Sequence, residues 1–114
     1  MRPNLSKFSI ACVVKNSFIS SIISSTVKNM DNAECTCIGD AIDLDYFIKD
    51  LRPDFLIFDD LNNFNEISKI IKDCGLSTTL IVLTQQPDDY PKDVLTLSMP
   101  FSPLKFKELI CKES

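Results

Sequence analysis

The sequence predicts an α/β domain built on a central five-stranded parallel sheet with helices on both faces. Two short apolar runs, 55–58 and 80–83, end directly in polar residues, which is typical of parallel strands that are buried on both faces. Segments with the apolar period of amphipathic helices lie between the candidate strands. Strand and helix therefore alternate along the chain, and this order implies right-handed crossovers within a single sheet.

The first part of the chain supplies two strands, each followed by a helix. Residues 10–16 contain the first strand, and Ser17 is expected to cap the following helix. A weakly alternating strand over 33–38 comes next, and Asp40 is expected to cap a second helix. Pro53 ends that helix, because the residue before a proline avoids the helical backbone region. The apolar positions expected to face inward from the first helix are Phe18, Ile19, Ile22, Ile23, Val27 and Met30.

The 55–58 strand is followed by a third helix. Asn63 with Glu66 three residues later resembles a capping box, and Gly75 is suited to a left-handed stop at the helix end. After the fourth strand, segment 85–93 contains two prolines and almost no apolar period. A proline inside a helix costs about 3 kcal/mol. We therefore expect the fourth helix to be shortened to a turn or a loop.

A fifth strand over 94–98 leads to the last helix, for which Ser102 is the expected cap and Pro103 the first residue. The side chains expected to face inward from this helix are Leu104, Phe106, Leu109 and Ile110.

Length and charge limit the classes of function. The 114 residues fit one domain, 1–114, with loose residues at 1–6. A net charge of −4 lacks the basic footprint that nucleic-acid binding requires. No apolar stretch approaches the roughly 20 residues that cross a bilayer, and the N-terminus lacks the apolar block of a secretory signal. We expect a cytoplasmic protein without nucleic-acid or membrane partners.

Residues that perform catalysis or hold cofactors are few. The chain has no histidine, which excludes Ser-His-Asp and Cys-His catalysis, and its two glycines do not form a phosphate-binding loop. The five cysteines are scattered through apolar segments and are expected to be reduced core residues. Cys35 and Cys37 share one face of their strand, but without histidine or C-x-x-C spacing we expect no metal there. We do not expect an enzyme.

Polar residues follow the candidate strands where α/β folds place their chemistry. Asp59 and Asp60 follow the third strand, Thr84 ends the fourth, and Pro100 follows the fifth. Their order and spacing resemble the receiver domain of bacterial two-component response regulators, which has a flavodoxin-like fold. In that family the aspartate after the third strand accepts a phosphoryl group, a Thr or Ser ends the fourth strand, and a Lys-Pro pair ends the fifth. The resemblance implies that Asp59 holds the phosphoacceptor position.

Other positions depart from that family. Val14 and Lys15 stand where the family has an acidic pair that holds Mg²⁺. Met99 replaces the lysine before Pro100, and Thr96 replaces the aromatic residue that reports phosphorylation. Mg²⁺ requires oxygen ligands, and acyl-phosphate formation requires positive charge beside the transferred oxygens. We therefore expect a degenerate receiver that binds neither Mg²⁺ nor another cofactor.

Two functions follow from this resemblance. The first is a pseudo-receiver signalling module that acts by protein contact, independently of phosphorylation. The second is a true phosphoacceptor in which the Lys15 ammonium compensates the charge of Asp59. Two placements of Lys15 remain open, beside Asp59 or extended into solvent. From local sequence alone, Asp59 and Asp60 also fit a simple polar strand exit before a turn.

The partner is expected to be a signalling protein or a second copy of the chain. By resemblance to receiver dimers, the contact face comprises the fifth strand and the last helix, 96–111. Candidate contact residues are Phe101, Lys105 and Phe106, with core packing as the alternative for the two aromatic side chains.

Overall fold

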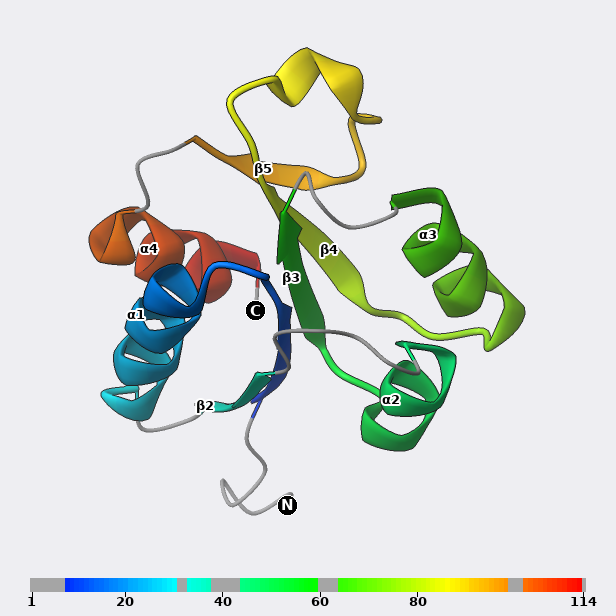
Figure 1. Ribbon diagram of the computed structural model, residues 1–114, viewed down its shortest axis with the longest axis horizontal. Coiled ribbons are helices and arrows are strands. Elements are labelled where there is room, and N and C mark those ends of the chain that lie inside the picture. The colour runs from blue at the N-terminus through cyan, green and yellow to red at the C-terminus, as the bar shows by residue number, and fades with distance from the viewer. Residues whose placement is uncertain (1–7, 31–32, 38–43, 60–63, 99–101, 114) are drawn as a thin grey trace.

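The computed structural model describes residues 8–30, 33–37, 44–59, 64–98 and 102–113 (Figure 1). Within these residues a single five-stranded sheet has the strand order β2-β1-β3-β4-β5, and all neighbouring strands are parallel. The strands are β1 (Phe8–Val13), β2 (Ala33–Cys37), β3 (Phe55–Asp59), β4 (Thr79–Leu83) and β5 (Leu95–Leu97). The helices are α1 (Ser17–Lys28), α2 (Leu44–Leu51), α3 (Phe64–Asp73) and α4 (Pro103–Glu113), with a short 3₁₀ turn η1 (Pro87–Asp89). The α/β fold class predicted from the sequence is confirmed.

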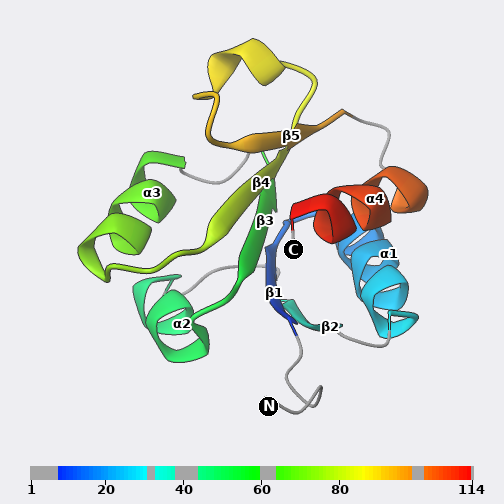
Figure 2. The ribbon, with the colours of Figure 1, turned by 180° about the vertical axis from the view of Figure 1, so that it is seen from behind.

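The helices cover both faces of the sheet. Figures 1 and 2 show α1 and α4 side by side on one face, and α2 and α3 on the other. The strand order reverses direction between β1 and β3, since the chain first adds β2 on one side of β1 and then places β3 on the other. In open α/β sheets, ligand chemistry gathers at such a reversal, beyond the carboxyl ends of the strands.

The sheet is buried on both faces because its central strands carry apolar side chains at every position. In β3, Phe55 and Ile57 join the core under α1 and α4, whereas Leu56 and Phe58 join the core under α2 and α3. This alternation follows from the two-residue period of a strand. It explains why β3 reads as an unbroken apolar run that ends at Asp59.

The N-terminus of α1 differs from the prediction that Ser17 is its cap. Asn16 is the cap, and its side-chain Oδ1 accepts the amide N–H groups of Phe18 at 2.9 Å and Ile19 at 3.2 Å. Asn and Ser cap helices about equally well. The position is decided instead by the backbone, which is still extended at Asn16 and already helical at Ser17.

The C-terminus of α3 ends as predicted at Gly75, whose φ of +64° lies in the left-handed region. The N–H of Gly75 donates to the Lys72 carbonyl at 3.1 Å, and the N–H of Leu76 donates to the Ile71 carbonyl at 3.1 Å. These two bonds satisfy carbonyl groups that the last helical turn leaves without intrahelical partners. The caps expected at Asp40 and Asn63 lie outside the described residues.

The connection from β4 to β5 confirms the expected loss of a full helix, since η1 is its only helical turn within the described residues. Tyr90 anchors this connection to the core. Its ring packs edge-on against Phe64, with centroids 5.5 Å apart, and against Phe58, with centroids 6.2 Å apart. An aromatic cluster therefore covers part of the sheet that a helix would otherwise cover.

Three apolar side chains near the helix starts decide between burial and exposure. Two that were expected to face inward are exposed, and one candidate contact residue is buried. Phe18 and Leu104 were expected to face inward, but they are 73% and 66% exposed. Both occupy the first turn of their helix and are mostly exposed to solvent instead of joining the core. Phe106, a candidate contact residue, is wholly buried in the core under α1 and α4 and offers no surface to a partner.

Within the described residues, no helix combines the length and the apolar character needed to cross a membrane.

The two α4 side chains provide a matched test of this packing. Phe106→Ala should lower the free energy of unfolding by about 3–5 kcal/mol, because it leaves a cavity in the core. Leu104→Ala should change it by less than about 0.5 kcal/mol, because the side chain is exposed. Urea unfolding followed by circular dichroism measures both; equal losses would contradict this packing of α4.

Candidate functional site

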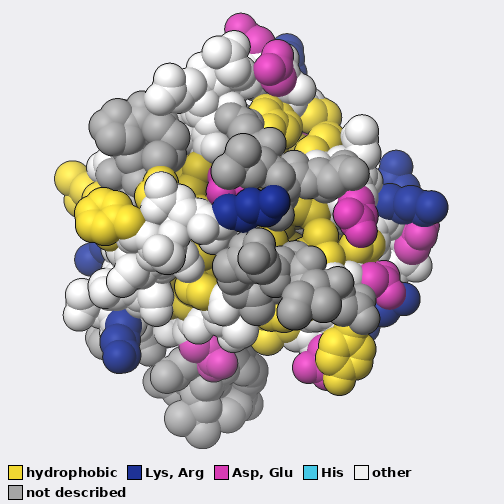
Figure 3. All heavy atoms as spheres, viewed as in Figure 1, with side chains coloured by type: hydrophobic (Ala, Val, Ile, Leu, Met, Phe, Trp, Pro, Cys, Tyr) yellow, Lys and Arg dark blue, Asp and Glu magenta, His cyan; other side chains and the backbone are white. Residues whose placement is uncertain are grey.

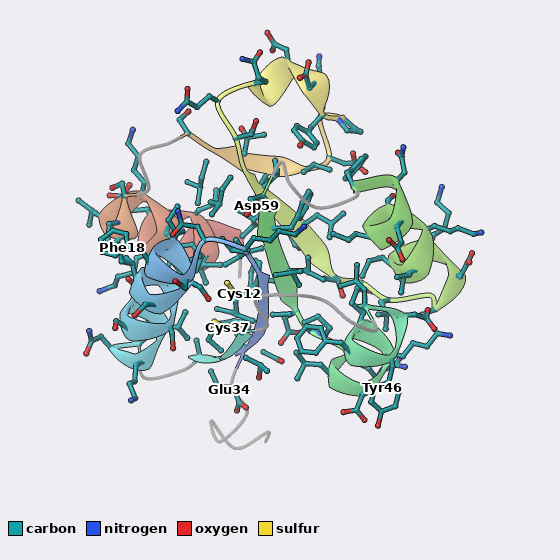
Figure 4. All side chains as sticks on the ribbon, viewed as in Figure 1. Cys12, Phe18, Glu34, Cys37, Tyr46 and Asp59 are labelled. Atoms are coloured by element: carbon teal, nitrogen blue, oxygen red, sulfur yellow. The ribbon has the colours of Figure 1, made fainter. Side chains whose placement is uncertain are left out.

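The candidate site lies where the carboxyl ends of β1 and β3 meet. Val13 pairs with Phe58 at the end of the β1–β3 ladder, so the chain that leaves β1 passes directly beside Asp59. Asp59 is partly exposed, and its Oδ2 accepts the backbone N–H of Lys15 at 3.1 Å. Figure 4 shows Asp59 at this end of β3, near the segment that joins β1 to α1. Asp59, the site position predicted from the sequence, is thus hydrogen-bonded to the segment that follows β1.

The opposite end of the same strand pair contains a similar bond. Asp54 precedes β3, and its Oδ2 accepts the backbone N–H of Ser9 at 2.8 Å. Each of these two carboxylates therefore binds an amide of the neighbouring β1 segment. Each bond gives a protein acceptor to an N–H group at one end of the ladder, so Asp59 makes a backbone contact that involves no ligand.

The two residues that replace the family's acidic pair have different environments. Val14 is wholly buried in the core under α1 and α4, so its side chain does not face the edge. Lys15 is exposed, and its backbone amide donates to Asp59. The next residue, Asn16, also lies at this edge, but its side-chain oxygen is engaged by the first turn of α1.

Asn16 is the residue of this edge that sequence reasoning missed. An asparagine directly before a serine-rich amphipathic segment is itself a helix-cap signal, and that signal was available.

Thr84 directly follows β4 and is 1% exposed. Its backbone N–H donates to the Leu97 carbonyl at 3.0 Å, which extends the pairing of β4 with β5. Its hydroxyl oxygen accepts the N–H of Gln86 at 2.9 Å, a side-chain-closed turn of the kind that Ser and Thr favour. Thr96 lies on the neighbouring strand β5, in register with Val82, and is half-buried.

The remaining predicted site residues are distributed as follows. Asp60, Met99, Pro100 and Phe101 lie outside the described residues. Lys105 is exposed on α4.

The described residues of this edge do not fit the magnesium site that the resemblance implies. Mg²⁺ in proteins is held by one or two carboxylates together with waters or substrate oxygens. Of the predicted site residues that the structure describes, Asp59 alone carries a carboxylate, and one of its oxygens already accepts the Lys15 amide. A search of the described part of the chain finds no group of three His, Cys, Asp or Glu side chains placed to hold a metal ion.

The Asp59 contact can be tested by amide hydrogen exchange. Asp59→Ala removes the acceptor of the Lys15 N–H, so exchange of that amide should become about tenfold faster, as expected for a hydrogen bond to a charged group. Asp54→Ala is the matched control, since it should accelerate the Ser9 amide and leave Lys15 unchanged. Exchange at Lys15 that does not respond to Asp59→Ala, measured by NMR, would contradict the contact.

Comparison with known proteins supports the fold. No protein-family model matches the sequence, and no curated protein matches it. Among solved structures, a response regulator receiver domain protein from Bacillus halodurans aligns with a TM-score of 0.81 at 16% identity, covering 96% of this chain and 98% of that one. A response regulator from Thermotoga maritima aligns with a TM-score of 0.77 at 14% identity, covering 93% and 96%.

A third similar structure is the receiver domain of a sensor histidine kinase from Pseudomonas aeruginosa, with a magnesium ion coordinated in its active-site cleft. It aligns with a TM-score of 0.75 at 14% identity, covering 94% of this chain and 97% of that one. At these identities the likeness concerns the fold. The chain therefore has the flavodoxin-like receiver fold, with Asp59 at the end of its third strand.

Proposed function

We propose that this chain is a pseudo-receiver, a signalling module that acts by contact with another protein and independently of phosphorylation. The observation that carries the proposal is the state of the Asp59 carboxylate. One of its oxygens accepts a hydrogen bond from the Lys15 amide, and the side chain of the preceding residue, Val14, is buried in the core. The carboxylate thus stabilises the junction of β1 and β3 in the unmodified protein.

The chemistry of phosphoryl transfer supports this proposal. Transfer to a carboxylate requires cations that neutralise the oxygens of the moving phosphoryl group, and this electrostatic effect usually dominates catalysis. In receivers, a metal held by an acidic pair and a lysine after the fifth strand supply that charge. Here Val14 and Lys15 replace the pair, and Met99 replaces the lysine.

The alternative function, a true phosphoacceptor, rests on the partial exposure of Asp59 and on the nearness of Lys15 in the chain. In this alternative the Lys15 ammonium would rotate toward the phosphoryl oxygens. Signal transmission would then require Thr84, whose hydroxyl oxygen is engaged by Gln86, and a neighbour at position 96 that is threonine instead of an aromatic residue.

For the contact surface we propose the neighbouring N-terminal ends of α1 and α4, which we call the apolar corner and define by Phe18 and Leu104. These helix ends lie side by side in Figures 1 and 2, and hydrophobic side chains are exposed at that margin in Figure 3. Lys105, a predicted contact residue, is exposed next to Leu104. Large apolar side chains exposed together at one place are a common feature of protein contact sites.

Treatment with a small acyl phosphate and Mg²⁺ tests the absence of phosphorylation. The intact mass of the wild-type chain should not increase, because the site lacks the charge that the transfer requires. A gain of one phosphoryl group that disappears in Asp59→Ala would overturn the proposal in favour of the phosphoacceptor.

Lys15→Asp provides the converse variant in the same experiment. It adds a second carboxylate at the exit of β1, so Mg²⁺ affinity measured by calorimetry should increase about tenfold or more. Lys15→Met is the matched control, since it removes the positive charge without adding a ligand. An equal increase in both variants would show that the charge of Lys15, and not the missing ligand, opposes the metal.

Self-association is the form of protein contact that the purified chain can test. If the apolar corner mediates it, sedimentation of the wild type should shift with concentration and Leu104→Glu should abolish the shift. Tyr46→Glu is the matched control, because Tyr46 on α2 is also 66% exposed but lies on the other face of the sheet. A wild type that stays monomeric at about 100 μM would remove self-association as the form of contact.

A further inference from the structure

Three cysteine side chains gather where β1 and β2 lie side by side beneath α1. Cys12 on β1 is in register with Cys37 on β2, and Cys35 lies two residues before Cys37 on the same face of the strand. Figure 4 shows Cys12 and Cys37 next to each other on these neighbouring strands. These thiols are far apart in the sequence, and the register of the sheet brings them together.

Close contacts link the three sulfur atoms to each other and to Ser20. The Sγ atoms of Cys35 and Cys37 are 3.6 Å apart. Cys12 Sγ lies 3.8 Å from the Ser20 hydroxyl oxygen, and Cys37 Sγ lies 3.8 Å from the Ser20 carbonyl oxygen. All five cysteines of the chain lie within the described residues and are thiols, not disulfides.

The thiols of this group differ in accessibility. Cys12 is wholly buried, whereas Cys35 and Cys37 are partly exposed. Cys37 also lines a surface hollow of about 410 Å³, whose other lining residues include Ser20 and Lys28 of α1. A water molecule occupies about 30 Å³, so this hollow readily admits a small polar oxidant. Such an oxidant reaches Cys37 from solvent but has no direct access to Cys12.

We propose that Cys37 is a thiol-oxidation site that reacts with a hydroperoxide and then closes a disulfide with Cys35. In the first step, the Cys37 thiolate attacks one peroxide oxygen. The O–O bond breaks, Cys37 becomes a sulfenic acid, and the departing oxygen leaves as hydroxide or alkoxide. In the second step, the Cys35 sulfur attacks the Cys37 sulfur, and an S–S bond forms. The Cys37 S–O bond breaks, the hydroxyl leaves as water with the Cys35 proton, and each peroxide consumed oxidises two thiols.

The surroundings of Cys37 favour its thiolate. Hydrogen bonds from the Cys12 and Cys35 thiols lower the pKa of Cys37 well below that of an ordinary thiol and outweigh the opposing effect of burial. The contact of Cys37 with the Ser20 carbonyl oxygen favours the protonated form of Cys37. The two hydrogen bonds from Cys12 and Cys35 have the larger effect. The same hydrogen bonds and burial raise the pKa of Cys12 and of Cys35. Cys37 is therefore the nucleophile of the group, since the thiolate is the reactive form.

Both Cys12 and Cys35 are within reach of Cys37, since neighbouring strands lie about 4.8 Å apart, and the edge position of β2 favours Cys35 as the second thiol. Residues two apart in a strand have Cα atoms about 6.6 Å apart, within the range of roughly 4.4–6.8 Å that disulfides span. Closing the bond bends the end of β2, an edge strand that pairs only with β1 among the described strands. A bond to Cys12 would instead distort β1, which is paired on both sides and packed in the core.

The test uses the full reduced chain and hydrogen peroxide in small excess. Oxidation should lower the number of free thiols by two and the intact mass by the mass of two hydrogen atoms. Peptide mapping should locate the new bond between Cys35 and Cys37. In Cys35→Ser, a sulfenic acid should accumulate at Cys37 and be trapped by dimedone. The Cys37→Ser variant should lose thiols to peroxide at a rate at least about tenfold lower than the wild type. Cys111→Ser is the control and should react like the wild type, although Cys111 is the exposed cysteine.

A second measurement does not depend on any variant being folded. Alkylation of wild-type Cys37 by iodoacetamide should slow less than about tenfold between about pH 8 and about pH 6, because its pKa is lowered. An ordinary thiol with a pKa of about 8.5 slows by nearly a hundredfold over this range. Preferential oxidation of Cys111, or a mapped Cys12–Cys37 bond, would overturn the proposed site.

Discussion

The pairing of β1 with β3 is the constraint on which the rest of this structure depends. Both strands are buried on both faces, so their backbone groups have no access to water and must bond to each other. The ladder is closed at one end by Asp54 on the Ser9 amide and at the other by Asp59 on the Lys15 amide. Asp59 thus contributes to the structure of this strand pair.

The Asp59 contact also bears on the proposed loss of phosphorylation chemistry. At the end of β1, the Val14 side chain joins the core and the Lys15 amide donates to the Asp59 carboxylate. This carboxylate therefore has a backbone partner in the unmodified protein. In the proposed pseudo-receiver, contact with a partner is made by the apolar corner of α1 and α4 and does not depend on phosphorylation.

The proposed thiol site is separate from this edge in chemistry but is connected to it by β1. Cys12 lies three residues before Lys15, and its register partner is Cys37 at the end of the edge strand. Oxidation would act on β2, whose outer side has no strand neighbour in the described part of the sheet. The interior strands would be left intact, because they are restrained by pairing on both sides.

The sequence by itself determined the α/β alternation, the position of Asp59 at the end of β3, the loss of a full helix within 85–93, and the stop at Gly75. These features follow from short-range patterns: apolar runs, prolines, and the backbone freedom of glycine. The tertiary structure alone decided the exposure of Phe18 and Leu104, and the exposure of Cys111, which had been expected in the core. It also selected core packing over surface contact for Phe106, and it decided the contact between the Lys15 amide and Asp59 and the gathering of Cys12 with Cys37. These depend on strand register and on how each helix packs on the sheet, which no local pattern specifies, because residues distant in the chain determine them.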